Sequence, residues 1–332
     1  MLRVVLCGVG GVGRNFVRVS REHAGIQVVA AYARNRSLHG RDLGELSGGP
    51  ATGTAVGDKE SALATEAEVL LIATSSFLRE VEAEIHDGLR AGLDVMSTAE
   101  EMAFPWEVDA AAARSIDEHA RAAGMTVMGA GANPGYIYEV VALALTGALW
   151  RVDRITTRRV VDLSGFGATV QRRLGIGYSP GDFAAGVRER SVFGHIGFPH
   201  TIRTFARRLG VKLDRIEETV VPIPAEGAIS STAVEVAVGE SAGMHQRTIG
   251  YVDSQPWFSA EFLGHVKPTS AGLTPQDSYQ IDGLPDIRAA VTPGFDPQST
   301  TAAALANLLP LLVAAPPGLI SVTDLPIPTP WR

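Results

Sequence analysis

Two adjacent carboxylates, Glu100 and Glu101, follow a short apolar run that ends at Ser97. The run Asp94–Ser97 is predicted to be a strand of a parallel sheet, and ligands bind at the carboxyl ends of such strands. A carboxylate in this place can take a proton from an ammonium group or stabilise a developing iminium cation. Acidic residues also favour the first turn of a helix because of its dipole. The spacing leaves both interpretations open for each glutamate.

A glycine-rich turn lies near the start of the chain and matches the pattern G-x-G-x-x-G. It follows a predicted strand, Leu2–Cys7, and opens a predicted helix that extends to about residue 23. In this context the first glycine permits a tight turn, the second lets a pyrophosphate approach, and the third lets the helix lie close to the strand. The amides at the helix start bind the anion. We therefore predict a dinucleotide site at Gly8, Gly10, Gly11, Val12 and Gly13.

The residues after the second predicted strand, Ile26–Ala31, bear on the choice of coenzyme. NAD is usually held there by an acidic side chain on the adenosine ribose. This chain has Arg34 and Arg36 instead, and no acid. Guanidinium groups match the oxygens of a 2′-phosphate. NADP is therefore the preferred coenzyme and NAD the second, unless the two arginines only form a solvated loop.

Small and polar residues follow three further predicted strands, Glu68–Ala73, Asp94–Ser97 and Met125–Gly129. Hydroxyl groups there suit the nicotinamide ribose, and the Asn133 amide suits nicotinamide or substrate. Each has a structural alternative: the hydroxyls are helix N-caps, and Asn133 caps a helix that has Pro134 at its first position. The predicted coenzyme contacts are Ala73, Thr74, Ser75, Ser76, Ser97, Thr98, Ala99, Asn133 and Pro134.

His195 lies between glycines in the segment 194–200, an unusual setting for a core histidine, and is a candidate substrate contact. The histidines show no metal-ligand spacing and no cysteine lies near them, so we expect no metal site. The single cysteine, Cys7, lies in an apolar run and is predicted to be a small core residue.

The order of the predicted elements indicates an α/β protein. Strands and helices alternate over the first 150 residues, which favours a Rossmann doubly wound parallel sheet. A second α+β domain, residues 151–298, is predicted to hold an open mixed or antiparallel sheet behind a long loop at 163–200. Residues 299–332 are expected to return to the first domain as a helix, Ser299–Ala314, and a surface tail. The strands predicted for the second domain are Arg154–Asp162, Thr219–Ile223, Ser231–Val238, Arg247–Val252, Phe258–Val266 and Ile287–Thr292.

Composition limits the partners. The chain has 332 residues, of which 45% are hydrophobic, and a net charge of −7. An acidic protein of this kind is not expected to bind nucleic acid or an anionic membrane. Its longest apolar stretches are far shorter than the roughly 20 residues that cross a bilayer. One cysteine and no visible signal peptide indicate a cytoplasmic protein.

With these residues assembled, the chain resembles a known family nearly from end to end. It is similar to the dihydrodipicolinate-reductase-like group that contains 2,4-diaminopentanoate dehydrogenase and the native amine dehydrogenases. Besides the glycine turn, the matching motifs are Ala73–Phe77, Ser97–Met102 with Pro105-Trp106, Gly131–Tyr136, Arg159 with Asp162, Phe166-Gly167 with Thr169-Val170, Gly194–Pro199, His245 before Gly250-Tyr251, and Ala315–Leu319.

The resemblance implies a homodimer that oxidatively deaminates an amine, releases ammonia and passes the hydride to NAD(P). It also implies that a glutamate of the Glu100-Glu101 motif handles the amine, and Glu100, nearer the strand end, is weakly preferred. Two positions depart from the pattern of the diamino-acid enzymes: this chain has Val161 where that pattern has Asn, and Glu139 where it has Asp. A valine cannot form the hydrogen bonds of the Asn amide, so we expect a substrate amine or ketone less polar than 2,4-diaminopentanoate. The predicted substrate contacts are Tyr138, Arg159, Val161, Phe166 and His195.

These observations favour an NAD(P)-dependent amine dehydrogenase, acting on a small amine or, with ammonia, on a ketone or aldehyde. The main alternative is an imine or carbonyl reductase of the dipicolinate type, and 2,4-diaminopentanoate dehydrogenase proper is another. A third hypothesis is a nucleotide-binding protein that is not an enzyme, because fold does not dictate function.

Overall fold

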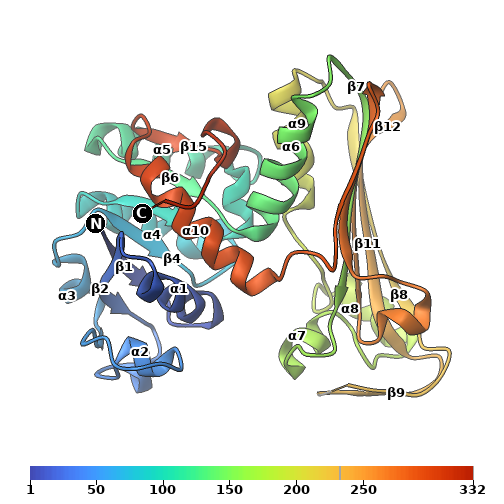
Figure 1. The fold of residues 1–332 in the computed structure, drawn as a ribbon, viewed down its shortest axis with the longest axis horizontal. Helices are drawn as coiled ribbons and strands as arrows, with labels where there is room; N and C mark the ends of the chain where they lie inside the picture. The colour runs from blue at the N-terminus through green and yellow to red at the C-terminus, as the bar shows by residue number, and fades with distance from the viewer. Residues whose placement is uncertain (232, 332) are drawn as a thin grey trace. The chain divides into compact units, whose positions relative to one another are not determined.

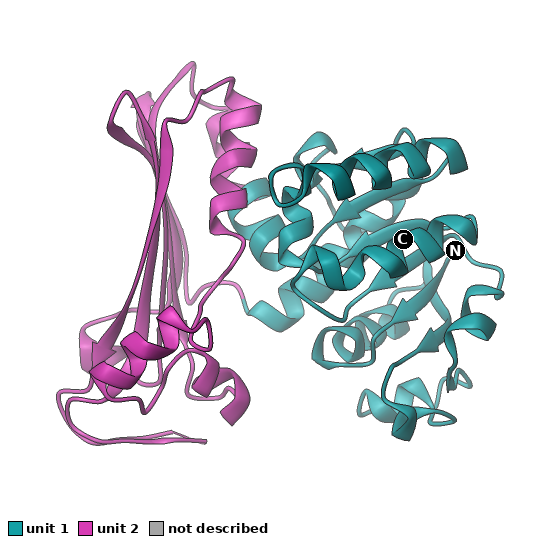
Figure 2. Ribbon diagram, turned by 180° about the vertical axis from the view of Figure 1, so that it is seen from behind, with its two compact units in different colours: residues 1–140, 296–332 teal, residues 141–295 magenta. Residues whose placement is uncertain are grey.

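The computed structural model describes residues 1–231 and 233–331, and the chain forms two compact units (Figure 2). Unit 1 consists of Met1–Val140 and Asp296–Arg332, and unit 2 of Val141–Phe295. Unit 2 is therefore one continuous insertion in the chain of unit 1. Among the described residues, no helix is long and apolar enough to cross a membrane.

Unit 1 is built on a seven-stranded sheet in the order β15-β6-β5-β4-β1-β2-β3. Every pair of neighbours in it is parallel, which confirms the predicted Rossmann-type sheet. The strands are β1 Leu2–Cys7, β2 Ile26–Tyr32, β3 Val56–Gly57, β4 Val69–Ile72, β5 Asp94–Ser97, β6 Thr126–Gly129 and β15 Gly318–Ile320.

Helices pack on both faces of this sheet. Contacts pair α1 with α10 and α4 with α5, and each pair shares an apolar cluster with one face of the strands (Figure 1). The helical segments of unit 1 are α1 Gly11–Glu22, η1 Arg36–Leu38, α2 Leu43–Leu46, α3 Lys59–Leu63, α4 Leu78–Arg90, η2 Glu100–Ala103, η3 Pro105–Glu107, α5 Ala110–Ala123, η4 Ala132–Val141, which unit 1 shares with unit 2 at its last residue, α10 Pro297–Val313 and η6 Val322–Asp324.

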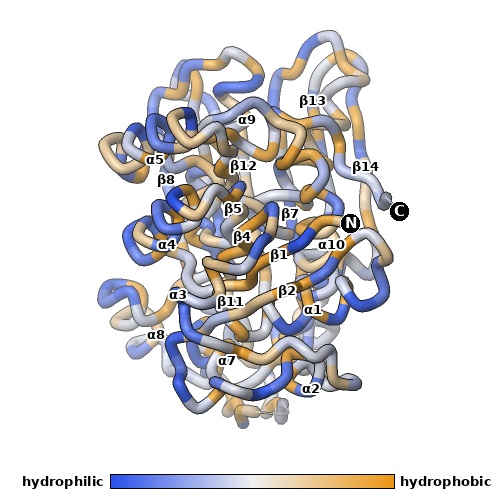
Figure 3. The backbone as a smooth tube through the Cα atoms, turned by 90° about the vertical axis from the view of Figure 1, so that its left-hand side faces the viewer, coloured by the Kyte–Doolittle hydropathy of each residue, from blue (hydrophilic) through white to orange (hydrophobic). Residues whose placement is uncertain are grey.

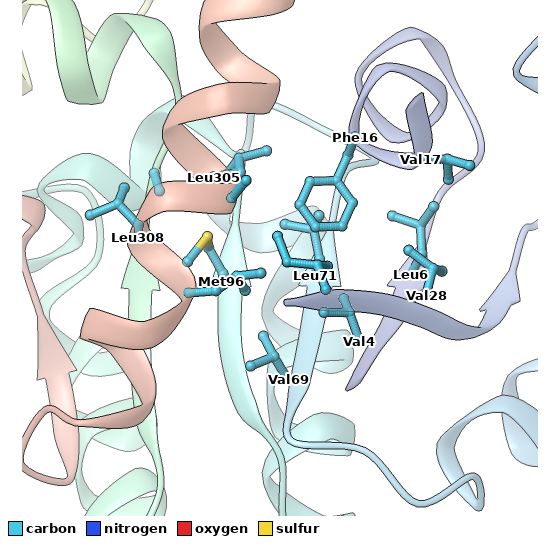
Figure 4. Close-up of a cluster of buried hydrophobic side chains, with 14 of the residues drawn as sticks. Val4, Leu6, Phe16, Val17, Val28, Val69, Leu71, Met96, Leu305 and Leu308 are labelled. Carbon is cyan, nitrogen blue, oxygen red and sulfur yellow. The ribbon is translucent and has the colours of Figure 1, made fainter. Parts of the chain in front are cut away.

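The strands form because their residues are apolar on both faces, as a sheet covered by helices requires. Alternate residues of β1 face opposite layers: Val4 and Leu6 pack with Phe16 of α1 and Leu305 of α10, whereas Val5 belongs to the cluster on the other face (Figure 4). In Figure 3 the hydrophobic colour follows the central strands, and the outer helices carry much of the hydrophilic colour.

The C-terminal tail differs from its prediction as a surface strap. Gly318–Ile320 pairs in parallel with β6 and closes one edge of the sheet as β15. Leu319 is buried, and its amide donates to Asp117 of α5 at 2.8 Å. Two prolines precede this short strand, so its sequence looks like a loop. The last residue of the predicted tail, Arg332, lies outside the described residues.

Unit 2 contains a six-stranded sheet in the order β14-β13-β7-β12-β11-β8. Only β7 and β12 pair in parallel, so the predicted open sheet is a mixed one. The strands are β7 Arg151–Asp162, β8 Arg215–Pro224, β11 Ser241–Val252, β12 Gln255–His265, β13 Gln276–Leu284 and β14 Ile287–Val291. The helical segments are α6 Ala142–Thr146, α7 Ala168–Arg173, α8 Pro180–Arg188, α9 Phe198–Leu209 and η5 Pro268–Ala271.

Three segments of unit 2 test the sequence predictions in different ways. The hairpin predicted around 250–255 is confirmed, because β11 and β12 turn at Asp253 and Ser254, both with positive φ. The predicted strand Ser231–Val238 is wrong in extent: a two-stranded sheet pairs β9 Ile229–Ser230 with β10 Glu235–Val236, and residue 232 lies outside the described part. Helix α9, which contacts β11 and β12, was not predicted.

The glycine turn between β1 and α1 has the geometry that its pattern predicts. Gly8 has φ +100°, and a Cβ there would lie 2.6 Å from the Ala73 carbonyl oxygen. A Cβ on Gly13 would lie 2.1 Å from the Gly8 carbonyl oxygen, so α1 can approach β1 only because residue 13 lacks a side chain. Gly10 and Gly11, in contrast, have nothing within 4 Å of their Cβ positions.

This contrast gives a test of the turn. Gly13→Ala forces a clash with backbone and is expected to lower the thermal unfolding midpoint. Gly10→Ala fits the fold, since Gly10 has an extended backbone with φ −83°, but it places a methyl group where the predicted dinucleotide would approach. We expect Gly10→Ala to keep the wild-type midpoint and to lose NADPH affinity about tenfold or more, or about 1.4 kcal/mol. Fluorescence titration and thermal denaturation measure the two effects. Undiminished NADPH binding by Gly10→Ala would place the dinucleotide elsewhere.

Candidate active site

The predicted coenzyme residues lie along one edge of the sheet of unit 1. Gly8 follows β1, Arg34 follows β2, Thr74 follows β4, Thr98 follows β5 and Asn133 follows β6. Backbone hydrogen bonds continue between these segments beyond the strands: Ala73 N donates to Cys7 O, Thr98 N to Ile72 O, and Ala130 N to Ser97 O, all at 2.8–2.9 Å. These hydrogen bonds therefore join the segments that follow neighbouring strands to one another.

The amino end of α1 follows the glycine turn at this edge, and the Arg14 side chain lies beside it, where Nε donates to Val9 O at 3.1 Å. Its N-cap is Gly10, which makes no side-chain cap, and its first turn contains no acidic residue. Amides and dipole at such a helix end attract an anion. Val12 is half-buried against the apolar cluster and holds the turn in place. Together with the open space at Gly10 and Gly11, this fits a bound diphosphate.

The two arginines after β2 differ in their surroundings. Arg34 Nη2 lies 3.3 Å from Glu84 Oε1 and 3.3 Å from the Glu80 carbonyl oxygen, both on α4. Its side chain is 70% exposed, so this exposed ion pair is weak and can open. Arg36 is the first residue of η1, whose N-cap Asn35 accepts a hydrogen bond from Ser37 N.

The serines of the predicted ribose site have partners within the protein. Ser75 Oγ accepts from Phe77 N at 3.2 Å and donates to Glu80 Oε2 at 2.7 Å. These bonds resemble those of a serine that caps the amino end of a helix, here α4. Ser97 is fully buried, and its Oγ accepts from Ala99 N at 3.2 Å. These bonds support the structural alternative for Ser75 and Ser97. At the same edge, Ala73 and Thr98 are half-buried and Thr74 is exposed.

The two glutamates of η2 make different contacts. Glu101 Oε2 accepts from Leu78 N at 2.7 Å, at the amino end of α4, where the N-cap Phe77 provides no side-chain cap. Glu101 N also donates to Ser76 O. Glu100 Oε1 accepts from Ser76 Oγ at 3.2 Å. Glu101 therefore acts as the dipole partner and cap of α4, and Glu100 is held by a hydroxyl at the end of β4.

Asn133 has the most distinctive side chain of this edge. Both its Oδ1 and its Nδ2 are buried, and neither has a hydrogen-bond partner among the described residues. The expected capping bond is therefore not formed. The turn behind it is held by Gly135 N, which donates to Glu139 Oε2 at 2.6 Å, and by Tyr136 N, which donates to Gly131 O at 2.9 Å. A buried amide without partners is costly, so its donor and acceptor fit a bound polar ligand such as a carboxamide.

The predicted substrate residues of unit 2 lie on or near β7. Arg159 is 2% exposed, and its Nη1 donates to both oxygens of Asp277 on β13, at 2.9 and 3.1 Å. Its Nη2 donates to Phe295 O at 2.8 Å, and Phe295 N donates to Asp277 at 2.7 Å. Burial raises the pKa of the Asp277 carboxyl, and the Arg159 charge opposes that shift. Arg159 thus has a structural role, and its contact with substrate stays a prediction.

The remaining predicted substrate contacts have varied settings. Tyr138 is fully buried in unit 1. Val161 is half-buried on β7, two residues from Arg159. Phe166 is half-buried before α7, and its carbonyl accepts from Gln171 Nε2 at 2.9 Å. The His195 ring packs against Phe198 and Phe262, with centroids 5.3 and 4.9 Å apart.

Three residues of this site were missed from the sequence: Asp277, Phe262 and Gln246. They surround Arg159 and His195 but come from three different strands. The one local signal was Gly194, because a Cβ there would lie 2.2 Å from Gln246 Oε1. A glycine that is sterically required beside a candidate residue points to a close partner.

Two further expectations concern metals and Cys7. Among residues 1–231 and 233–331, no three histidine, cysteine or acidic side chains gather in a way that holds a metal ion. Burial raises the pKa of Cys7 to about 11, so the thiol stays protonated. Cys7 is 3% exposed in the core of unit 1, as predicted for a small core residue.

Two known families match successive parts of the chain, and the second match covers unit 2 together with the C-terminal segment of unit 1. Residues 2–85 match the family described as dihydrodipicolinate reductase, N-terminus. Residues 136–332 match the family described as 2,4-diaminopentanoate dehydrogenase C-terminal domain.

Relatives over the full length agree with this match. The chain is 30% identical to 2,4-diaminopentanoate dehydrogenase of Acetoanaerobium sticklandii, over 98% of this chain and 94% of that protein. It is 27% identical to an amine dehydrogenase of Streptomyces virginiae, over 98% and 97% of the two chains. Among solved structures, the amine dehydrogenase from Mycobacterium smegmatis superposes with a TM-score of 0.85 and 25% identity, over 100% of this chain and 97% of that one.

The resemblance inferred from the motifs is thereby confirmed. The chain belongs to the 2,4-diaminopentanoate dehydrogenase family, whose members named here are dehydrogenases of amines.

Proposed function

We propose that this protein is an NAD(P)-dependent amine dehydrogenase, which reversibly deaminates a small amine to a ketone or aldehyde and ammonia. The observation that carries the proposal is the pair of groups at neighbouring strand ends. Glu100 provides a carboxylate after β5, and Asn133 provides, after β6, a buried amide to which no described residue is hydrogen-bonded. Membership of an amine-dehydrogenase-containing family supports the same chemistry.

In the proposed reaction, different residues bind the coenzyme and transfer protons. The coenzyme, when bound, accepts or supplies the hydride at its nicotinamide ring. The amides at the start of α1 would hold its diphosphate, and the Asn133 amide would orient its nicotinamide end. The Glu100 carboxylate takes a proton from the substrate ammonium group, which frees the nitrogen lone pair. Once this proton has passed to solvent, the carboxylate stabilises the iminium cation that remains when the hydride leaves the substrate carbon. It then takes a proton from the water that adds to this carbon, the substrate nitrogen gains a proton, and ammonia leaves as the carbonyl forms.

Glu100 is assigned this role over Glu101 because of their contacts. The Glu101 carboxylate accepts from the Leu78 amide at the start of α4, so moving it would leave that amide without a partner. Glu100 Oε1 accepts from the Ser76 hydroxyl at 3.2 Å, and that hydroxyl can rotate, whereas the Leu78 amide that Glu101 caps is fixed in the backbone. The valine at position 161 favours a substrate less polar than a diamino acid.

The first test of this proposal uses turnover. Purified protein with NADPH and a panel of small ketones and aldehydes is expected to oxidise NADPH only when ammonium is added at high pH. Glu100→Gln keeps the shape but removes the base, and we expect a loss of kcat of about a hundredfold or more. Glu101→Gln is the matched variant, and it is expected to lower the thermal midpoint more than kcat, because it weakens the cap of α4.

Two results would contradict the proposal. Reduction of a carbonyl or cyclic imine without ammonium indicates the reductase alternative. A Glu100→Gln variant with wild-type kcat shows that the carboxylate takes no part in the chemistry.

We further propose that NADPH is the preferred coenzyme. The support is Arg34, whose exposed guanidinium lies after β2, where residues 32–36 include no acidic residue that could hold the 2′-hydroxyl of NAD. Its ion pair with Glu84 keeps it near this edge and is weak enough to exchange for a phosphate.

Removal of the guanidinium tests this preference. Arg34→Ala is expected to lower the ratio of NADPH to NADH affinity about tenfold, because a charged hydrogen bond is lost. The control is Arg90→Ala, which removes the same charge from the last turn of α4. Isothermal titration with both coenzymes measures the ratio, and an unchanged ratio in Arg34→Ala would exclude a contact with the 2′ position.

We also propose that two copies of the chain form a homodimer through the sheet of unit 2. Helix α9 contacts one face of this sheet, and Ile202 lies against Gly250 there. The other face carries no long helix among the described residues (Figure 1). Across it, Arg158, Glu261 and Arg247 are neighbours on β7, β12 and β11, and Val221 of β8 is 48% exposed. An open face with paired charges and exposed apolar groups suits a second copy.

Sedimentation tests the dimer. Wild-type protein is expected to sediment at about twice 35.0 kDa. Ile249→Lys puts a charge in the middle of the open face and is expected to give monomers, whereas Ile327→Lys, at a 60% exposed site in unit 1, is expected to leave the dimer intact. Monomeric wild-type protein, or a dimeric Ile249→Lys variant, would refute this interface.

A further inference from the structure

The backbone of His195 is held by a single buried side chain. His195 N donates to Gln246 Oε1 at 2.8 Å, and Gln246 Nε2 donates to His195 O at 2.6 Å. The Gln246 residue is 2% exposed. Its second Nε2 proton goes to Glu218 Oε2 at 2.9 Å, so both polar atoms of its amide are used. The Gln246 carboxamide thus bonds both the backbone N–H and the carbonyl of His195, as the backbone of a neighbouring β-strand would.

The glycine before His195 is part of the same arrangement. A Cβ on Gly194 would lie 2.2 Å from Gln246 Oε1 and 3.2 Å from the sulfur of Met244. Any larger residue would displace the Gln246 amide. The glycine next to His195 therefore serves close packing with Gln246 and does not make this segment a loose loop.

The His195 ring is fixed by a row of residues across the sheet. Asp277, Arg159, Phe262 and Gln246 are direct neighbours on β13, β7, β12 and β11. The ring meets Phe262 edge to face, with an interplanar angle of 88°. Burial raises the pKa of the Asp277 carboxyl, and the charge of Arg159 is the main influence that opposes this rise. The His195 ring opposes it slightly as well. The row thus supplies an aromatic contact, a charge pair and a backbone clamp.

We propose that Gln246 is a positioning residue, which sets the place of the His195 imidazole and thereby the affinity for the small amine or carbonyl substrate. This rests on the proposed function and on the sequence prediction that His195 contacts the substrate. Gln246 acts through His195 and not on the reacting atoms. Without the two hydrogen bonds from Gln246, the His195 imidazole moves more freely, and substrate binding must restrict that motion at a cost in entropy. We therefore expect KM to rise while kcat changes little.

The experiment uses two variants that break the clamp in different ways. Gln246→Met keeps the length of the side chain but removes its three hydrogen bonds. Gly194→Ala pushes against the amide from the other side. The matched control is Thr248→Val on the same strand: it removes a 2.7 Å bond to the same Glu218 oxygen and leaves both bonds to His195 in place.

The first readout needs no substrate. NMR signals of the His195 ring, identified by their loss in His195→Gln, are expected to shift or broaden in Gln246→Met and Gly194→Ala and to stay unchanged in Thr248→Val. The second readout is a KM about threefold to tenfold higher in the first two variants, at nearly wild-type kcat, for the best ketone or aldehyde of the wild type with ammonium.

The outcomes separate this inference from the proposed function. Unchanged His195 signals in both clamp variants, or an equal shift in Thr248→Val, would overturn the positioning role. A normal KM in variants whose His195 signals have moved would overturn the link to substrate affinity. If the wild type has no ammonium-dependent turnover, the proposed function fails, and with it this link to substrate affinity, whereas the NMR comparison still decides whether Gln246 positions His195.

Discussion

The close approach of α1 to β1 is the constraint on which unit 1 depends. Gly13 lies against the Gly8 carbonyl, and Gly8 lies against Ala73, which follows β4, the neighbour of β1 in the sheet. These close approaches bring the amino end of α1 to the carboxyl edge of the sheet. A bulkier residue at position 8 or 13 would move the helix and with it the helix end that is proposed to hold the diphosphate.

Much of unit 1 was predictable because its physics is local. Strands β1, β4, β5 and β6 are short apolar runs, and a strand covered on both faces needs little else. Strand β13 escaped prediction for the opposite reason. Its inward residues are Asp277, Tyr279 and Ile281, and a buried aspartate hides the alternation unless its partner Arg159 is known to lie opposite. That pairing joins residues 118 positions apart, which no window of sequence reveals.

The candidate site shows the same division. Residue types and strand ends were sufficient to choose the glycine turn, the glutamate pair and Asn133. They did not distinguish Glu100 from Glu101, because that difference lies in one contact with the amide of Leu78. In unit 2 the sequence indicated Arg159 and His195 but not Gln246 or Phe262, since cross-strand neighbours depend on register. Where side chains from several strands combine, the structure was needed.

The interrupted course of unit 1 has a consequence for how the chain is made. Its apolar cluster is completed by Leu305, Leu308 and Leu309 of α10, and its sheet by β15, all of which follow unit 2 in the chain. Trp331 then bonds the Ala306 carbonyl and packs against His23, near the beginning. On the ribosome, where domains fold as they emerge, the inserted unit is complete before the one that surrounds it. Nascent unit 1 must therefore wait, with one face of its sheet only partly covered, until residues 305–331 have been synthesised.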